Sequence, residues 1–499
     1  MQQPSQRSSQ VAPIPVPGQR GERDPGPPRD TRRSRIPGAS RVTRELAARP
    51  TPYLLGIAFF GLYALISLLR FRHVENPSWD LAIFEQAVKG YAHLDAPTID
   101  VRSPGLNQLG NHFSPILAVL APFYRIFPSP LTLLIAQAAL FALAVVPITR
   151  MASTALGTAR GAAIGIAFGL SWGVQRAVEF DFHEVAFAVP LLAFSMEKLV
   201  ERRWTAAVLW ALPLLLVKED MGLTVGALGI YLLTQRRWRL GAALMVLGAL
   251  AMALTVYVVI PGMNPDGVYE EGEKAGGGSL FGLFGGFPQD LFWPFLKTKT
   301  YLWVFGVVGF LALRSPIVIL AVPTLAWRML SDTPNHWGQD WHYNAVLMPI
   351  VFAALVDAVR AAGESPAPWQ RTYARNLPGA VLAASLALCA YMPAAHVIEP
   401  DEYKASPRLA AANQAVRLVK KGSTVETDLG LISQLPSRAT VYWIGATGKV
   451  VPDYVAVNRP DVWDAEARRT LEADAAQRHP GARYTVVYDN VFVILKRVG

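Results

Sequence analysis

Long apolar stretches alternate with short polar segments along most of the chain. A helix needs about 20 mostly apolar residues to cross a bilayer, so this pattern predicts an α-helical, multi-spanning membrane protein. Several stretches are shorter, and we expect their ends to extend into the flanking polar residues. The eleven predicted spans cover residues 52–69, 131–149, 161–178, 184–199, 205–217, 221–235, 240–260, 301–313, 316–330, 343–359 and 377–395.

The apolar stretch 113–127 decides the topology of these spans. If it does not cross, the basic segments 150–160, 202–203, 236–239 and 360–375 all share the side of the Arg-rich N-terminus, which the positive-inside rule places in the cytoplasm. If it crosses, all of them lie outside. We therefore expect 113–127 to be a helix in the outer interface, with the N-terminus cytoplasmic and the C-terminus extracytoplasmic.

Composition agrees with this class of protein, because hydrophobic residues fill 52% of the 499 positions and charged residues only 17%. The first fifty residues carry ten Arg, four acidic residues and many Pro, Gly and Ser. Such a segment cannot bury enough apolar surface to fold, so 1–50 is predicted to be a disordered Arg/Pro-rich cytoplasmic tail. It contains no apolar run of the kind found in a cleavable signal peptide.

The expected partners follow from charge and cysteine content. We interpret the basic tail as a topology signal beside a lipid bilayer, and we expect no nucleic acid partner. The single cysteine, Cys389, lies in an apolar run, which leaves neither a disulfide framework nor a cysteine metal site.

After residue 396 the pattern becomes that of a soluble domain, which we place at 396–499, with the transmembrane domain at 51–395. Asp489-Asn490 between two strand-like runs predicts a tight hairpin. No Gly-rich phosphate loop is present, so the domain is predicted to be small, α/β and extracytoplasmic. Helices are expected at 409–419 and 466–477, and strands at 440–444, 454–457, 484–488 and 491–495.

The predicted topology gathers the ionisable clusters on one face of the membrane, where charges near lipid are costly and usually functional. They lie at 80–112, 179–183, 218–220, 261–300 and 332–342. We predict a polar chamber at the outer surface. The Gly- and aromatic-rich 261–300 loop suits a lid over a lipid-linked ligand, or is an unstructured connector.

Asp80 is the central candidate of this chamber. Ser78 can cap a helix that starts beside it, which puts Asp80 in the first turn at the positive end of the helix dipole. Asp80 either supports the cap or acts chemically. Glu85, on the same helix, is another chamber candidate.

Two further acidic clusters offer ligands or proton carriers. Glu179, Asp181 and His183 form a possible metal or acid/base set, or are satisfied polar groups at a span end. Lys218 can hold a phosphate, or pair with Glu219 or Asp80. Glu219 and Asp220 follow it directly and are chamber candidates.

Histidines mark two more candidate positions. His112 opens the interfacial helix and can donate to a phosphate at its N-terminus. His336, Asp340 and His342 follow Asp332, but their spacing fits no standard zinc pair. The tryptophans among them suggest an interface belt or a sugar-stacking surface.

The motifs Asp80-Leu-Ala-Ile-Phe-Glu-Gln, His112-Phe-Ser-Pro, Asp181-Phe-His183 and Lys218-Glu219-Asp220 resemble a family of multi-pass bacterial membrane proteins over about 50–499. The layout is similar to the GT-C superfamily of glycosyltransferases that use polyprenyl-phosphate sugars. Asp80 matches the acidic residue of that superfamily's first outer loop, Glu179 or Asp181 the second, and 113–127 an interfacial helix. The chain has one Asp, not an Asp–Glu pair, at residue 80, so a divalent cation cofactor stays open.

The resemblance implies a plasma-membrane transferase that moves a sugar from a polyprenyl-phosphate donor to a cell-envelope glycan, lipid or protein. Asp80 would be the general base, and Lys218, His112 or Arg102 would offset charge on the departing phosphate. The alternatives are a lipid or glycolipid transporter (flippase) and a non-catalytic envelope scaffold. The ionisable residues gather on one face of the membrane, and the sequence shows no two halves of inverted topology. Both observations favour the transferase over a transporter.

Overall fold

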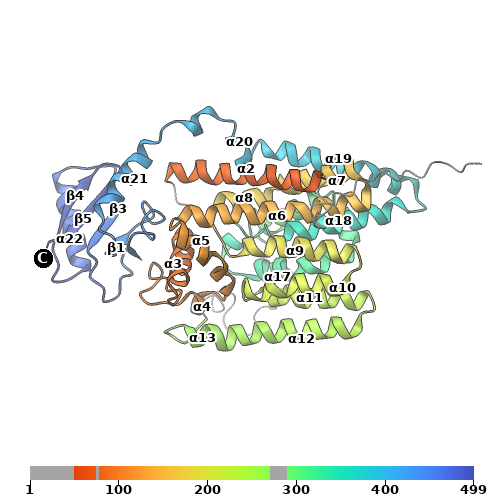
Figure 1. The fold of residues 1–499 in the computed structure, drawn as a ribbon, viewed down its shortest axis with the longest axis horizontal. Coiled ribbons are helices and arrows are strands. Elements are labelled where there is room, and N and C mark those ends of the chain that lie inside the picture. Colours follow the sequence, from red (N-terminus) through yellow and green to blue (C-terminus); the bar gives the residue numbers. More distant parts are fainter. Residues whose placement is uncertain (1–49, 75–77, 270–288, 499) are drawn as a thin grey trace, which may run out of the picture. The chain divides into compact units, whose positions relative to one another are not determined.

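The computed structural model of the protein describes residues 50–74, 78–269 and 289–498. Along these residues a bundle of helices is followed by a small domain with a β-sheet (Figure 1). The predicted disordered tail, apart from Pro50, and residues 270–288 of the predicted lid lie outside the described residues.

Three helices in the described part of the chain are long and apolar enough, by length and composition, to cross a membrane: Thr51–His73, Pro130–Leu156 and Trp238–Met263. The first is α2 and the second is α6, whose start is capped by Ser129 accepting a hydrogen bond from the N–H of Leu131. The third joins α12 (Trp238–Leu254) through a π-helical turn to α13 (Ile260–Met263). Eleven spans remain a prediction.

Several predicted spans are interrupted in the structure, among them 377–395, which is divided between two helices at 390–392. The 161–178 stretch is divided into α7 (Thr158–Gly169) and α8 (Trp172–Phe180). The 205–217 stretch is α10 (Trp204–Ala211) followed by a 3-10 turn, η2 (Leu212–Leu216), where Pro213 lacks the N–H that would continue the α-helix.

Two further interruptions also have local causes. The 301–313 stretch is α16 (Phe295–Gly306) and η5 (Leu311–Arg314), separated by left-handed backbone at Gly309 and Phe310. The 316–330 stretch begins as a 3-10 helix, η6 (Pro316–Ala321), before α17 (Val322–Leu330). The remaining helices of the bundle are α9 (Val185–Val200), α11 (Met221–Thr234), α18 (Leu347–Gly363), α19 (Pro368–Cys389) and α20 (Pro393–His396).

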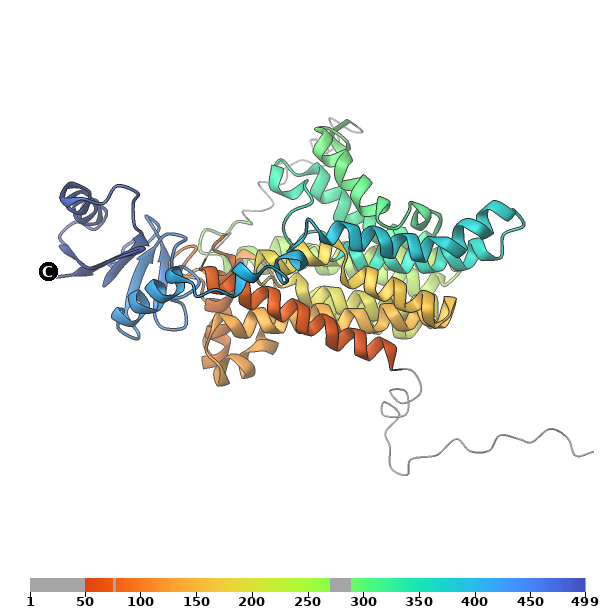
Figure 2. The ribbon, with the colours of Figure 1, turned by 90° about the horizontal axis from the view of Figure 1, so that it is seen from above.

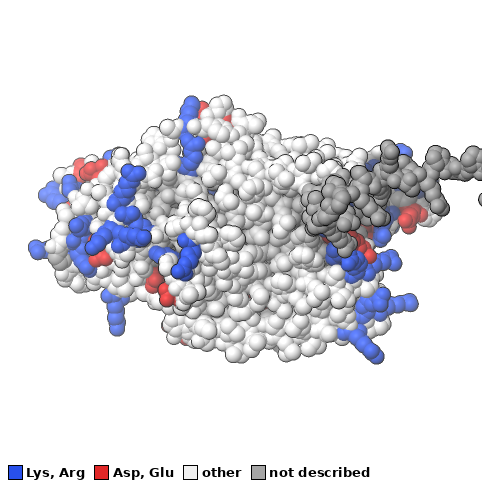
Figure 3. Space-filling model, viewed as in Figure 1, with Lys and Arg blue, Asp and Glu red and all other residues white. Residues whose placement is uncertain are grey.

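The helices of the bundle run roughly alongside one another (Figures 1 and 2). Helix α6 packs against α2, α7 and α9, and α11 packs against α12. Apolar side chains on α12 are exposed, among them Leu250 and Leu254. Figure 3 shows a broad band of this face without charged side chains and Lys or Arg on either side of it. An apolar band between charged ends is what a bilayer requires.

Short helices lie at the end of the bundle nearer the C-terminal domain (Figure 1). They are α3 (Asp80–His93), α4 (Gln108–Asn111), η1 (Pro115–Leu120) and α5 (Ala121–Ile126). The 113–127 stretch thus forms two short helical pieces that pack against α3 and expose the apolar side chains of Val119 and Phe123. A helix with one exposed apolar face is typical of an interfacial position.

The C-terminal domain holds a five-stranded sheet in the order β2-β1-β3-β5-β4. Strand β1 is parallel to β2 and β3, whereas β5 is antiparallel to β3 and β4. The light-blue segment in Figure 2 leads into this domain through η8 (Pro400–Tyr403) and α21 (Pro407–Leu418). The other elements are β1 (Thr424–Thr427), β2 (Thr440–Trp443), β3 (Tyr454–Asn458), α22 (Ala465–Arg478), β4 (Tyr484–Asp489) and β5 (Phe492–Arg497).

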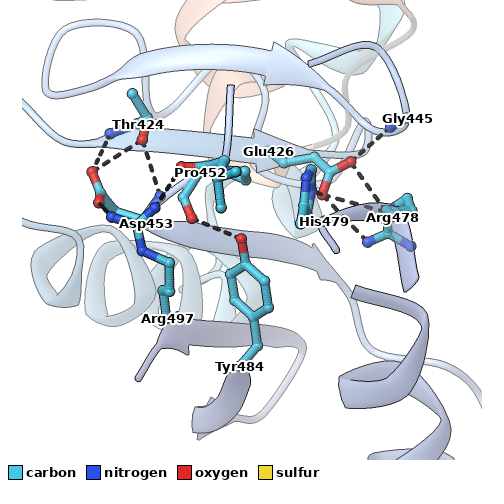
Figure 4. A network of polar contacts seen from close by, with 10 residues as sticks. Thr424, Glu426, Gly445, Pro452, Asp453, Arg478, His479, Tyr484 and Arg497 are labelled. Atoms are coloured by element: carbon cyan, nitrogen blue, oxygen red, sulfur yellow. Dashed lines mark hydrogen bonds and ion pairs between the residues drawn. The ribbon is translucent and has the colours of Figure 1, made fainter. Parts of the chain in front are cut away.

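Both predicted helices, the four predicted strands and the hairpin at Asp489-Asn490 are confirmed. Strand β1 was not predicted, because it is short and carries the fully buried Glu426. Its carboxylate accepts a hydrogen bond from the N–H of Gly445 at 2.7 Å and lies 2.9 Å from His479 Nε2 and 3.1 Å from Arg478 Nε (Figure 4). These partners allow an acidic residue in the middle of a sheet and tie the end of α22 to β1.

Candidate active site

Asp80 is the first residue of α3, whose N-cap residue is Trp79 without a side-chain cap and not the predicted Ser78, although Ser78 still bonds to Asp80. The N–H of Asp80 donates to Ser78 Oγ at 3.0 Å, and the Ser78 hydroxyl donates to Asp80 Oδ2 at 2.5 Å. The same Oδ2 lies 3.6 Å from Nε2 of His183, and the Asp80 side chain is 26% exposed. The Asp80 carboxylate thus bonds to Ser78 and stands beside an imidazole while its side chain stays partly exposed.

His183 belongs to a short non-helical segment, 181–183, between α8 and α9. Gln137 of α6 holds this segment, since its Nε2 donates to the carbonyl of Asp181 at 2.8 Å and its Oε1 accepts from the N–H of His183 at 3.1 Å. The φ of Asp181 is 126°, which residues with side chains adopt only where their surroundings enforce it, often at functional sites. The His183 ring stacks on that of His342 with centroids 3.6 Å apart.

Two carboxylates therefore lie near His183 in different environments. Burial raises the pKa of Asp181 to about 7, although Arg70 of α2 lies 3.3 Å away and opposes the shift. Burial also acts to raise the pKa of Asp80, but the hydrogen-bonding and charge effects of His183 and Ser78 bring it below its ordinary value. Asp80 is thus ionised at neutral pH, whereas Asp181 titrates near neutrality. Such separation of two carboxyl pKa values is common where acid and base roles are divided.

The 218–220 segment, between η2 and α11, forms two pairs with other parts of the chain. Lys218 Nζ lies 3.0 Å from Oε1 of Glu184, and both side chains are largely buried. His112 Nδ1 lies 2.8 Å from Oε1 of Glu219. Burial alone would raise the pKa of Glu219, but the charge and hydrogen bond of His112, together with Lys218 and a backbone hydrogen bond, lower it to about 2. The sequence left the partner of Lys218 open between Glu219 and Asp80, and the structure shows Glu184 instead.

Other candidates lie at the margin of this cluster. Asp220, beside Glu219, has its pKa raised to about 6 by burial. Glu179 pairs with Arg176 at 2.6 Å, and Arg176 reaches Asp340 at 3.8 Å. The guanidinium of Arg102 lies 5.9 Å from the ring centre of Trp79, the residue before Asp80. The structure thus brings segments 80, 102, 112, 179–184, 218–220 and 340–342 to one region, whereas the chamber itself stays a prediction.

Two candidates face elsewhere. Glu85 is fully buried and accepts a hydrogen bond from Tyr124 Oη at 2.8 Å, so it points toward α5 and not toward His183. Burial raises its pKa to about 8. His336 Nδ1 lies 2.7 Å from Ser331 Oγ. Within the described residues, segment 332–342 brings no three ligand atoms close enough for one metal ion, and neither do Asp80, Asp181 and His183.

Sequence reasoning missed Arg70, Gln137 and Glu184. The first two are polar residues in otherwise apolar helices, a signal that could have identified them because such residues are rarely placed in lipid. Glu184 directly follows the His183 motif but was assigned to a span.

The C-terminal domain contacts the helix that carries Asp80. Gln86 of α3 donates to the carbonyl of Val441 in β2 at 3.0 Å and accepts from the N–H of Val101 at 2.9 Å. The rings of Trp79 and Trp443 meet edge to face with centroids 5.2 Å apart. These contacts connect the position of α3 to the edge of the sheet.

The fold resembles the crystal structures of ArnT from Cupriavidus metallidurans, a GT-C glycosyltransferase. The structure bound to undecaprenyl phosphate matches with a TM-score of 0.52 and 14% identity, over 90% of this chain and 98% of ArnT. The apo structure matches with a TM-score of 0.53 and 13% identity, over 89% and 97%. At this identity the likeness shows the fold alone.

The chain belongs to the family described as predicted membrane protein (DUF2079), whose pattern matches residues 74–495. No curated protein matches the chain.

Proposed function

We propose that the protein is a plasma-membrane glycosyltransferase that moves a sugar from a polyprenyl-phosphate donor to a cell-envelope acceptor on the outer face. One observation carries this proposal: in a GT-C-type fold, an ionised and partly exposed Asp80 stands at the start of α3 against His183. The ArnT structure of the same fold binds undecaprenyl phosphate, which supports a lipid-phosphate donor for this chain too.

The proposed reaction is a single inverting displacement. Asp80 takes the proton of the acceptor hydroxyl while that oxygen bonds to the anomeric carbon of the sugar. The bond from this carbon to the phosphate oxygen breaks, and the polyprenyl phosphate leaves with the bonding electrons. A base must be unprotonated to act, and the lowered pKa of Asp80 keeps it so at neutral pH.

Positive groups near Asp80 would stabilise the leaving phosphate. Lys218 has three N–H donors, so it can keep Glu184 at 3.0 Å and still donate to a phosphate. His112 and Arg102 are the other proposed phosphate partners. Asp181 and His183 would position the acceptor and Asp80. This reaction needs no metal ion, and the possible divalent cation of the sequence prediction is not used in it.

The deciding measurement is mass spectrometry of envelope glycans and polyprenyl-phosphate sugars from a deletion strain. We expect an unused donor to accumulate on the outer leaflet together with loss of one glycan, because transfer is blocked after donor synthesis. A donor stranded on the cytoplasmic leaflet would identify a flippase. Unchanged amounts of donors and glycans would identify the protein as a non-catalytic envelope scaffold.

We also propose the eleven-span topology, with residues 1–50 in the cytoplasm and 396–499 outside. The charge-free band and the basic side chains beside it support spanning (Figure 3). In a Cys389→Ser background, a membrane-impermeant maleimide should label Lys449→Cys in intact cells and Thr158→Cys only after permeabilisation. Both positions are exposed, so accessibility depends on the side of the membrane. Labelling of Thr158→Cys in intact cells would contradict this topology.

A further inference from the structure

A second cluster of ligand-type side chains lies at the end of α2. His73, the last residue of this helix, has Nε2 only 2.7 Å from Oε2 of Glu402. Glu402 belongs to η8, in the segment that leads from the bundle to the C-terminal domain. The contact joins two parts of the chain that are 329 residues apart.

The same Glu402 faces a second histidine. Nδ1 of His396, the last residue of α20, lies 4.0 Å from Oε1 of Glu402 and 3.4 Å from Oε1 of Glu399. Ligand atoms of His396, Glu399 and Glu402 all lie within 4.8 Å of one another. One carboxylate thus stands between two imidazoles, with a second carboxylate beside it.

This arrangement matches what a divalent transition-metal ion requires. Zinc is bound tetrahedrally by imidazole nitrogen and carboxylate oxygen at about 2.0–2.2 Å, which puts neighbouring ligand atoms about 3.4 Å apart. The ligand atoms of His396, Glu399 and Glu402 lie within 4.8 Å of one another, and His73 lies outside this group but approaches it through Glu402 at 2.7 Å, so side-chain rotations would close the site. The side chains of His396 and Glu399 are more than half exposed, which leaves a path for the ion.

Ion pairing alone is a weak reason for four such groups to meet. Exposed ion pairs add little stability. The charged side chains beside this cluster have other partners. Lys404 pairs with Asp401 at 2.6 Å, and Arg72 donates to the carbonyl of Lys404 at 3.4 Å. Among the described residues, no Lys or Arg side chain pairs with any of these four ligands.

We propose that His73, His396, Glu399 and Glu402 bind one divalent transition-metal ion of the Zn²⁺ type. Four protein ligands form a closed set, which is typical of structural and not catalytic sites. The ion would fasten the end of α2 to the segment that leads into the C-terminal domain. It would be separate from the Asp80 cluster, to which α2 contributes Arg70 instead. The inference does not depend on sugar transfer.

The test uses full-length protein in detergent, stripped of metal with a chelator and then titrated with Zn²⁺ by calorimetry. Elemental analysis counts the bound ion, and Co²⁺ absorption reports tetrahedral coordination. We expect three variants, His73→Gln, His396→Ala and Glu402→Gln, each to bind one Zn²⁺ fewer than the unsubstituted protein, or to bind it more than about 100-fold more weakly. The reason is that losing even an outer-shell partner of a ligand lowers metal affinity by about 10–100-fold, and these residues are the ligands themselves. Asp401→Asn, in the same segment and outside the ligand set, is the matched control and should bind normally.

A second measurement separates metal binding from folding. Metal-free Tm values should be similar for all variants, and added Zn²⁺ should raise the Tm of the unsubstituted protein and of Asp401→Asn only. Absence of Zn²⁺ binding by the unsubstituted protein would overturn the proposal. So would a Zn²⁺ count and affinity that none of the three substitutions changes, since the bound ion would then lie elsewhere.

Discussion

Replacing Asp80 by asparagine should lower turnover in sugar transfer by about 10²–10⁴-fold, the usual worth of proton transfer by a positioned side chain. Asparagine keeps the size of aspartate and can still bond to Ser78, but it cannot take a proton at neutral pH. Donor binding should change little, because the proposed phosphate partners are Lys218, His112 and Arg102. The measurement is initial rate per folded molecule in detergent, with donor affinity determined separately.

The control for this substitution is Asp95→Asn, because Asp95 is an exposed aspartate just beyond the end of α3. Its turnover should equal that of the unsubstituted protein. If Asp80 only supported the helix cap, Asp80→Asn would lower the folded yield and the Tm without a selective loss of rate. Near-normal turnover of the folded Asp80→Asn variant would show that Asp80 is not the general base.

Lys218→Met should have the second largest effect, and on two quantities at once. Lys218 is the partner of the buried Glu184 at 3.0 Å, and removing one member of a buried pair typically costs about 3–5 kcal/mol. The folded yield should therefore fall. Donor binding by the remaining folded protein should weaken by roughly 10–100-fold, the equivalent of a hydrogen bond to a charged group.

The double variant Lys218→Met/Glu184→Gln separates these two effects. Without the charge of Glu184, the buried site no longer holds an uncompensated carboxylate, so the folded yield should recover much of its loss. Donor affinity should stay low, because the phosphate still lacks its cation. Recovery of both yield and donor affinity would show that Lys218 serves only to neutralise Glu184.

Features that depend on neighbouring residues in the chain could be predicted from sequence. The apolar runs of α2 and α6 are long enough to identify these helices without any tertiary contact. Ser78 was expected to bond near the start of this helix, and its hydroxyl oxygen accepts from the N–H of Asp80 two positions along, although Trp79 is the N-cap residue. The strands β4 and β5 follow from a local turn signal. In each case the determining interactions are short in sequence.

The interruptions within predicted spans show where this reasoning ends. Hydropathy reports that 161–178 is apolar, but it does not report that the helix stops after Gly169. That glycine packs closely against the ring of Phe59 in α2, where a Cβ would lie only 2.4 Å from the ring. A contact with another helix therefore favours glycine at this break.

The sequence by itself determined that the chain is a membrane protein and which segments carry its ionisable residues. Only the tertiary structure decided the partners: Lys218 with Glu184, His112 with Glu219, and Glu85 with Tyr124 and not with the residues near Asp80. The physical reason is that a buried charge takes the partner that packing brings within about 3 Å, and packing joins segments far apart in the chain.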